Sequence, residues 1–256
     1  NQKITATPKL TSNFLVVFLL LALVFPSLAF AEDQEISDPF EPVNRGVFWF
    51  NDKFDYVVAE PVAKGYDAVV PDTVQTGIGN FFMNLANPGF FVASLLQGKF
   101  EQSLDILGRF VINSTVGVLG FIDVAKRYNL PHHREDFGLT FAEWGIPAGP
   151  YLVLPVLGPS NVRDGVGLVF DAVLNPLFWT ESLFGTSSDE SFWIGFGAAS
   201  LWFIDTRADL SEAIDTAKES SLDYYLFLQS SYYQHRQGLL VDGATPEDSD
   251  EDWADD

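Results

Sequence analysis

The stretch Asp38-Pro39-Phe40-Glu41-Pro42-Val43-Asn44-Arg45 carries the first helix start of this 256-residue chain. Asp38, Pro39 and Glu41 match an N-cap acid, a proline at the first helical position and a glutamate at the third. Apolar residues then recur at spacings of three and four, at Val43, Val47, Phe50, Phe54 and Val57. This pattern predicts an amphipathic helix with one apolar face.

Similar spacing predicts helices along most of the chain. Pro61 should close the first helix and open a second, Asp72 should start a third, and residues 100–111 have one apolar side. A long final helix is predicted over residues 206–237, with a cap signature at Thr206. Residues 151–154, within a Gly/Pro-rich segment, fit either a short strand or an extended loop. We therefore expect a mainly α fold with little or no β, in one domain over residues 38–243.

The composition narrows the possible partners. The chain has 35 acidic and 14 basic residues, a net charge of -21, and no cysteine. So negative a chain repels a nucleic acid backbone, and the sequence offers no thiol for a disulfide, a thiolate metal site or a cysteine nucleophile. Mean hydropathy is nevertheless positive, at +0.12, and phenylalanine occurs 24 times. An acidic but apolar chain favours a protein that touches lipid.

Both ends of the chain differ from its body. Residues 1–31 match a cleaved Sec signal peptide, with Lys3 and Lys9 before an apolar run at 14–25 and then Ala29-Phe30-Ala31. We expect cleavage after Ala31; cleavage after Ala29 and an uncleaved anchor are the alternatives. Residues 32–37 would be a linker, and 244–256 a disordered acidic tail. Export without disulfides fits a bacterial envelope.

The strongest lipid signal is at residues 192–204, which are apolar apart from Ser200. The segment is shorter than the roughly 20 residues that span a bilayer, so it fits a core helix or an interfacial helix. Aromatic side chains at both ends are typical of a helix at the headgroup boundary. The candidates for membrane contact are Phe192, Trp193, Phe196, Trp202 and Phe203.

No catalytic motif stands out, and we predict no catalytic residue, metal or cofactor. Residues 132–136 are the only cluster of metal-ligand residue types. The adjacent His132 and His133 point in different directions on a helix or strand, so they seldom share a metal. A solvated loop is the expected state of this cluster.

Ordered blocks over residues 38–243 resemble the MlaA family, also called VacJ. They include Asp38-Pro39-Phe40-Glu41-Pro42-Val43-Asn44-Arg45 and Gly117-Val118-Leu119-Gly120-Phe121. Further blocks lie at residues 48–51, 60–63, 79–81, 96–98, 109–110, 113–115, 122–125, 135–138, 149–151, 154–155, 163–164, 204–208 and 232–236.

The resemblance implies a ring-like helical domain in the outer membrane, with a central amphipathic channel and no enzyme activity. Such a protein would remove phospholipids misplaced in the outer leaflet and pass them to a soluble periplasmic carrier like MlaC. Trimeric porins would be its outer-membrane partners. Arginine and lysine suit a passing phosphate, and the candidates in the matched blocks are Arg45, Lys64, Arg109 and Arg163. Each could instead pair with a nearby acid.

One feature departs from the family, which usually carries a cysteine at the signal cleavage site. Without cysteine we expect no lipidation, so that membrane residence rests on the helices and on partners. Two other functions stay open. The first is a soluble periplasmic lipid-binding or scaffold protein, and the second is a hydrolase acting on envelope lipid, for which His133 would be the residue to change.

Overall fold

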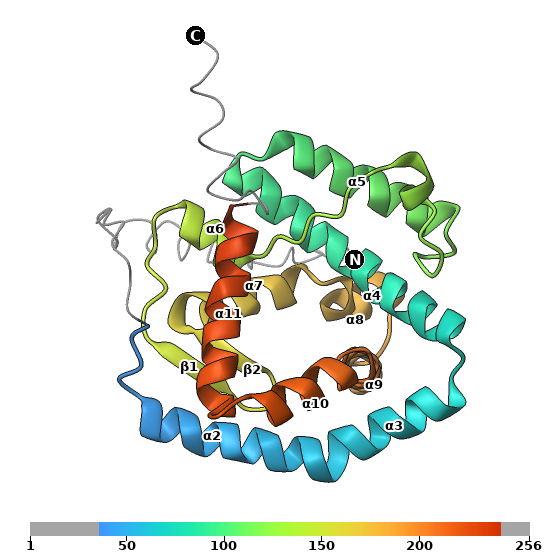
Figure 1. Ribbon diagram of the computed structural model, residues 1–256. Coiled ribbons are helices and arrows are strands. Elements are labelled where there is room, and N and C mark those ends of the chain that lie inside the picture. Colours follow the sequence, from blue (N-terminus) through green and yellow to red (C-terminus); the bar gives the residue numbers. More distant parts are fainter. Residues whose placement is uncertain (1–35, 242–256) are drawn as a thin grey trace, which may run out of the picture. The chain divides into compact units, whose positions relative to one another are not determined.

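The computed structural model describes residues 36–241, which belong to one compact unit, Glu35–Asp256 (Figure 1). The expected signal peptide and acidic tail, at residues 1–31 and 244–256, lie outside the described residues. The described part is mainly helical, as the sequence predicts, with one small two-stranded sheet. In this part no helix combines the length and the hydropathy that crossing a membrane requires.

The elements comprise α-helices, one π-helical turn (η1), two 3-10 turns (η2 and η3) and two strands. In chain order they are α2 (Glu41–Phe54), η1 (Asp55–Ala59), α3 (Glu60–Val69), α4 (Asp72–Gln97), α5 (Phe100–Thr115), η2 (Ala125–Tyr128), α6 (Phe137–Glu143), β1 (Tyr151–Leu154), β2 (Gly158–Asn161), α7 (Val162–Leu174), η3 (Pro176–Trp179), α8 (Thr180–Phe184), α9 (Ser188–Asp209), α10 (Ser211–Ser220) and α11 (Tyr224–Leu240).

The first three elements form one continuous helical arc. α3 opens at Glu60 with Pro61 in its first turn, as predicted, but no non-helical residue precedes it, so the predicted end of the first helix at Pro61 is wrong. Proline lacks an N–H group and its ring crowds the carbonyl four residues earlier, which normally kinks or breaks a helix. Here the π-helical turn η1 ends two residues before Pro61 and changes the hydrogen-bonding register. The arc therefore runs from residue 41 to residue 69 without interruption.

The predicted capping role of Asp38 is also wrong. α2 begins at Glu41, and no side chain caps its first turn. The Asp38 carboxylate instead accepts hydrogen bonds from Asn44 at 2.8 Å, from Gln229 at 3.1 Å and from the Tyr225 hydroxyl. Asp38 thus ties α2 to α11, and this tertiary contact replaces the local cap.

The long helix predicted over residues 206–237 is three helices, the end of α9, then α10 and α11. Thr206 lies inside α9, so the cap signature predicted there is wrong. The sequence pattern did not predict the boundary between α10 and α11. There the Asp223 carboxylate accepts hydrogen bonds from the backbone N–H groups of Tyr225 and Leu226 at 3.0 and 3.3 Å. Asp223 is therefore the N-cap of α11.

The other expected helix starts, at Asp72 and near Phe100, are confirmed by α4 and α5. Residues 151–154 form strand β1, which pairs antiparallel with β2. The Asn44 side chain accepts from the Val153 N–H and donates to the Tyr151 carbonyl, each at 3.0 Å. The sheet is therefore hydrogen-bonded to α2 as well as to itself.

Packing closes these elements into a ring, which confirms the expected fold (Figure 1). α2 packs on β1, β2 on α11, α11 on α6, and α6 on α4. α4 then packs on α9, and α9 packs on α3, which continues the α2 arc. A small apolar cluster lies where the sheet meets α11, at Tyr151, Val153 and Tyr225. The expected central channel stays a prediction.

Close packing of α6 on α7 depends on two glycines. A Cβ atom at Gly167 would lie 2.5 Å from the backbone nitrogen of Gly138, and one at Gly138 would lie 2.6 Å from a carboxylate oxygen of Asp164. The first collision involves backbone, which cannot move aside without separating the helices. At Gly46 and Gly65, in contrast, an added Cβ would meet nothing within 4 Å.

We expect Gly167→Ala to lower the free energy of unfolding by roughly 1–3 kcal/mol, because the added methyl group forces the two helices apart. Thermal unfolding in detergent measures the effect. Gly65→Ala is the matched control and should be neutral or stabilising by up to about 1 kcal/mol, since alanine favours a helix interior. Equal loss of stability in both variants would contradict this packing account.

Candidate functional site

Side-chain exposure in this unit is the reverse of that in a water-soluble protein. Among the described residues 11 apolar residues are buried, against 17 polar or charged ones, while 44 large apolar side chains are exposed. Buried polar groups and large exposed apolar areas are the informative departures from ordinary proteins. We call the exposed apolar side chains of residues 40–74, 95–122 and 156–202 the apolar surface.

Helix α5 shows the reversal within a single element. Its apolar side, with Phe100, Leu104 and Val111, is exposed. Its other side buries Arg109 and Asn113. A helix with this distribution places its polar face inward, against the rest of the ring.

Helix α9 carries the predicted membrane-contact residues. Phe192, Trp193, Phe196 and Trp202 are exposed, whereas Phe203 is half-buried and packs on Phe54 with ring centroids 6.2 Å apart. The alternative of a core helix is therefore wrong. Whether these side chains contact a membrane stays a prediction.

The inner side of α9 is held by charged groups. Arg207 donates to both carboxylate oxygens of Asp55, at 2.5 and 3.1 Å, and Lys218 donates to Asp55 at 3.0 Å. Burial opposes ionisation of Asp55, but the hydrogen bonds from Arg207 and Lys218 outweigh it and lower the Asp55 pKa. Nearby, the Tyr66 hydroxyl donates to Asp205 at 2.5 Å. These contacts fix α9 and α10 on the first arc, through η1 and α3.

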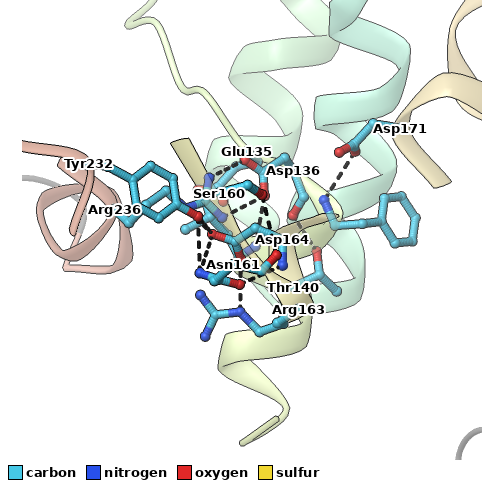
Figure 2. Close-up of polar contacts among 12 residues, drawn as sticks. Glu135, Asp136, Thr140, Ser160, Asn161, Arg163, Asp164, Asp171, Tyr232 and Arg236 are labelled. Carbon is cyan, nitrogen blue, oxygen red and sulfur yellow. Dashed lines mark hydrogen bonds and ion pairs between the residues drawn. The ribbon is translucent and has the colours of Figure 1, made fainter. Parts of the chain in front are cut away.

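A second polar network joins α6, β2, α7 and α11 around Asp164 (Figure 2). Its carboxylate accepts from Tyr232 at 2.5 Å, from Arg163 at 2.9 Å and from Asn161 at 3.0 Å. Arg236 makes ion pairs with both Asp164 and Asp136. Burial raises the pKa of Asp164, but Arg236, Tyr232 and Arg163 lower it by more, so the net pKa is below its ordinary value.

Asp171 lies beside this network without a cation of its own in the described part of the chain. Its carboxylate accepts a hydrogen bond from the Phe137 N–H at 3.1 Å. Burial, and then the negative charge of Asp136, raise the pKa of Asp171 to about 7. Asp171 is therefore partly protonated near neutral pH.

The four predicted phosphate-binding candidates do not converge on one site. Arg45 pairs with Glu41 and Asp223, and the exposed Lys64 pairs with Glu60. The buried Arg109 pairs with Asp123, and the half-buried Arg163 pairs with Asp164. All four are ion-paired, as the alternative reading of these residues expected. A role in phospholipid contact stays a prediction.

Arg109 is the centre of a third polar cluster. It donates to both oxygens of Asp123 at 2.8 Å and to the Leu130 carbonyl at 2.5 Å, and it contacts His132. Asn113 also donates to Asp123, at 3.0 Å. Arg109 thus fixes the chain that follows α5.

The histidine cluster separates in the structure. His132 contacts Asp123 at 3.3 Å, whereas His133 contacts Asp105 at 3.2 Å. Within residues 36–241 no group of three or more acidic or histidine side chains is arranged to hold a metal ion. These histidines therefore act as partners of separate carboxylates.

Sequence reasoning missed the charged groups that hold the ring. Asp55, Arg207 and Arg236 were not singled out, because their partners are 152 or 100 residues away in the chain. One signal was present: Asp205 and Arg207 directly follow an aromatic run, and charges in such a place are often buried and paired.

Comparison with known proteins gives a consistent result. The family model described as "MlaA lipoprotein" matches residues 36–239. The chain is 33% identical over 219 residues to the intermembrane phospholipid transport system lipoprotein MlaA of Escherichia coli (strain K12), covering 83% of this chain and 81% of that protein. It is 32% identical over 216 residues to the protein of the same name from Shigella flexneri, with the same two coverages.

A solved structure also matches. It comes from work on the structural basis for maintenance of bacterial outer membrane lipid asymmetry, with a TM-score of 0.66 and 30% identity. The match covers 80% of this chain and 99% of that chain. An uncharacterized protein of Rickettsia felis is 35% identical over 207 residues, which are 80% of this chain and 79% of that protein.

Replacing Asp55 should destabilise the ring. Asp55→Asn leaves Arg207, whose side chain is 6% exposed, without its counter-charge, and an unpaired buried charge costs about 3 kcal/mol or more. Thermal unfolding in detergent measures the loss. The control is Glu60→Gln, because the Lys64 partner is 62% exposed and an exposed pair contributes at most about 1 kcal/mol. Similar effects of both changes would argue against the Asp55 anchor.

Asp171 should make stability depend on pH. An unfolded aspartate has a pKa of about 3.9, so the folded chain binds this proton more tightly and its free energy of unfolding falls as pH rises toward 7. Asp171→Asn keeps an oxygen that can accept from Phe137 and removes the titration. The variant should unfold at a higher temperature than the parent at about pH 8, with the difference shrinking toward about pH 4. A difference independent of pH would contradict the assignment.

Proposed function

Because the chain belongs to the MlaA family, we propose that it is a non-enzymatic component of phospholipid transport between bacterial membranes, located in the outer membrane. Its task would be to remove phospholipids misplaced in the outer leaflet and so maintain lipid asymmetry. The relatives are named as lipoproteins of an intermembrane phospholipid transport system. These names support a role for this chain in phospholipid transport between membranes.

The observation that carries the proposal is the reversed exposure of side chains. Burying apolar area is worth roughly 25 cal/mol per Å², so the apolar surface would be strongly unfavourable in water. Against acyl chains it is favourable. The apolar, tryptophan-bearing stretch of α9 covers only residues 192–204 of its 22 residues and suits a position within one leaflet better than a span.

We propose that the lipid passes through the centre of the ring. Helices that are apolar outside and polar inside can surround a hydrated path for headgroups while their outer faces meet acyl chains. Arg45, Lys64, Arg109 and Arg163 are the candidates for steadying the phosphate, by exchanging a carboxylate partner for the lipid. The lipid would then go to a soluble periplasmic carrier of the MlaC kind, and a trimeric porin would hold the ring in place.

Two alternatives make different predictions. A soluble periplasmic lipid-binding or scaffold protein would leave membranes in an alkaline carbonate wash, whereas the apolar surface should keep this chain in the pellet. A hydrolase would consume phospholipid, and its activity would be lost on changing His133. In the structure the His133 side chain pairs with Asp105 at 3.2 Å.

Deleting the gene should place phospholipid in the outer leaflet and sensitise cells to detergent. Surface phosphatidylethanolamine, measured on intact cells with an amine-reactive probe that does not cross membranes, reports the first effect. Restoring the wild-type gene should reverse both effects. Unchanged surface phospholipid after deletion would contradict the proposed transport.

A further inference from the structure

We propose that residues 116–134 form a membrane-anchoring site for anionic phospholipid. The apolar tip, residues 116–122, would enter the acyl-chain region, and Lys126, Arg127 and Arg134 would hold lipid phosphates. This inference rests on the proposed membrane location and adds a lipid class and a site to it. In Figure 1 the segment is the green loop that follows α5.

The backbone of the apolar tip is strained in a way that presents apolar side chains to the outside. Val118 and Leu119 have φ angles of 55° and 57°, in the left-handed region that non-glycine residues avoid, β-branched ones above all. Their side chains are 65% and 66% exposed. In water this conformation combines backbone strain with apolar exposure and gains no burial in return. Strain of this kind points to a functional role.

The apolar tip is held rigidly despite that strain. A Cβ at Gly120 would lie 2.3 Å from the Asn84 side chain, and Asn84 donates to the Leu119 carbonyl at 3.2 Å. The Phe121 ring occupies the space where Gly77 lacks a side chain, 2.3 Å from a Cβ placed there. The tip is therefore pinned to α4 in its extended position, as a preformed wedge would be.

The three basic side chains differ from every other cation in the described part. Of the 12 lysines and arginines in residues 36–241, nine make an ion pair with a carboxylate. The three that make none there are Lys126, Arg127 and Arg134, and all three are exposed. In a chain with a net charge of -21, leaving just these cations available favours an anionic partner from outside the ring.

Arg109 keeps the basic side chains near one another and beside the apolar tip. Arg109 binds Asp123, which precedes Lys126 and Arg127 in the sequence, and the carbonyl of Leu130, which follows them. Arg134 lies close enough to His132 for its charge to lower the His132 pKa, after burial and Arg109. Asp123, the one acid among residues 116–134, is already paired with Arg109.

An apolar wedge next to three cations that make no ion pair within residues 36–241 matches the boundary of an anionic bilayer. Acyl chains lie beside phosphates there, and each basic side chain near the surface strengthens binding by roughly fivefold. Nucleic acid or an acidic protein would use the cations but not the exposed Val118 and Leu119. The combination therefore favours a membrane of anionic phospholipid.

The absence of native cysteine gives a clean test. Val116→Cys can be labelled at a single thiol with a dye whose emission shifts to the blue in an apolar medium. The full chain would be reconstituted in vesicles of phosphatidylcholine alone and of phosphatidylcholine with phosphatidylglycerol. We expect a larger blue shift with phosphatidylglycerol, and loss of that increase at high salt.

Two sets of changes separate the parts of the site. Lys126→Gln, Arg127→Gln and Arg134→Gln together should abolish the increase that phosphatidylglycerol causes, whereas Lys53→Gln, at an exposed lysine outside the site, should not. Val118→Asn with Leu119→Asn should remove the blue shift in both vesicles. Because asparagine tolerates the left-handed region, this variant should unfold at no lower temperature than the parent, so misfolding would not explain the loss.

A label at Phe196→Cys in α9 distinguishes failure of this inference from failure of the proposed function. A blue shift at residue 196 with none at residue 116 would overturn the anchoring site and leave the membrane location intact. No shift at either residue would count against both. An equal shift at residue 116 in the two vesicle types would overturn the role of the basic side chains.

Discussion

Carboxylate pairs with arginine and lysine, on the inner side of the helices, hold this ring together. Asp55 with Arg207 joins the first arc to α9, and Asp164 with Arg236 joins α7 to α11. In lipid the hydrophobic effect does not drive helices together, so polar contacts and close approach at small residues must do so. The small apolar cluster and the Gly138–Gly167 contact fit the same requirement.

The same constraint explains why the outside can be apolar. Since the polar groups find partners within the ring, the outer faces of α5 and α9 need no charges. The π-helical turn η1 lets the first arc pass Pro61 and places Asp55 where Arg207 and Lys218 reach it. A backbone irregularity therefore serves both the continuity of the arc and its anchoring.

Much of the fold follows from local sequence, and the remainder depends on distant partners. Helical periodicity correctly places α4 and α5, and the family resemblance correctly gives the ring. Periodicity does not predict the helix boundary at residues 221–223, where Asp223 caps a new helix although the apolar spacing continues. The local sequence also misleads at Asp38, because the partners in α11 that replace a cap are 187 and 191 residues away.

The candidate site is less accessible to sequence reasoning. Composition shows that basic residues are few. Only the structure shows that nine of them make ion pairs within residues 36–241, and that Lys126, Arg127 and Arg134 make none there. Likewise, the aromatic run in α9 marks a lipid candidate, yet an apolar helix looks the same in sequence whether it lies in a core or outside. The exposure of Trp193 and Trp202 decides between these.

The central claim is that the apolar surface lies against acyl chains. Trp49, Trp193 and Trp202 are on that surface. In a variant with Trp144→Phe and Trp253→Phe, which removes the two tryptophans outside it, intrinsic fluorescence can be measured in vesicles whose acyl chains carry bromine. The account predicts strong quenching by brominated chains and little quenching by iodide in the water. Strong quenching by iodide, with none by brominated chains, would contradict it.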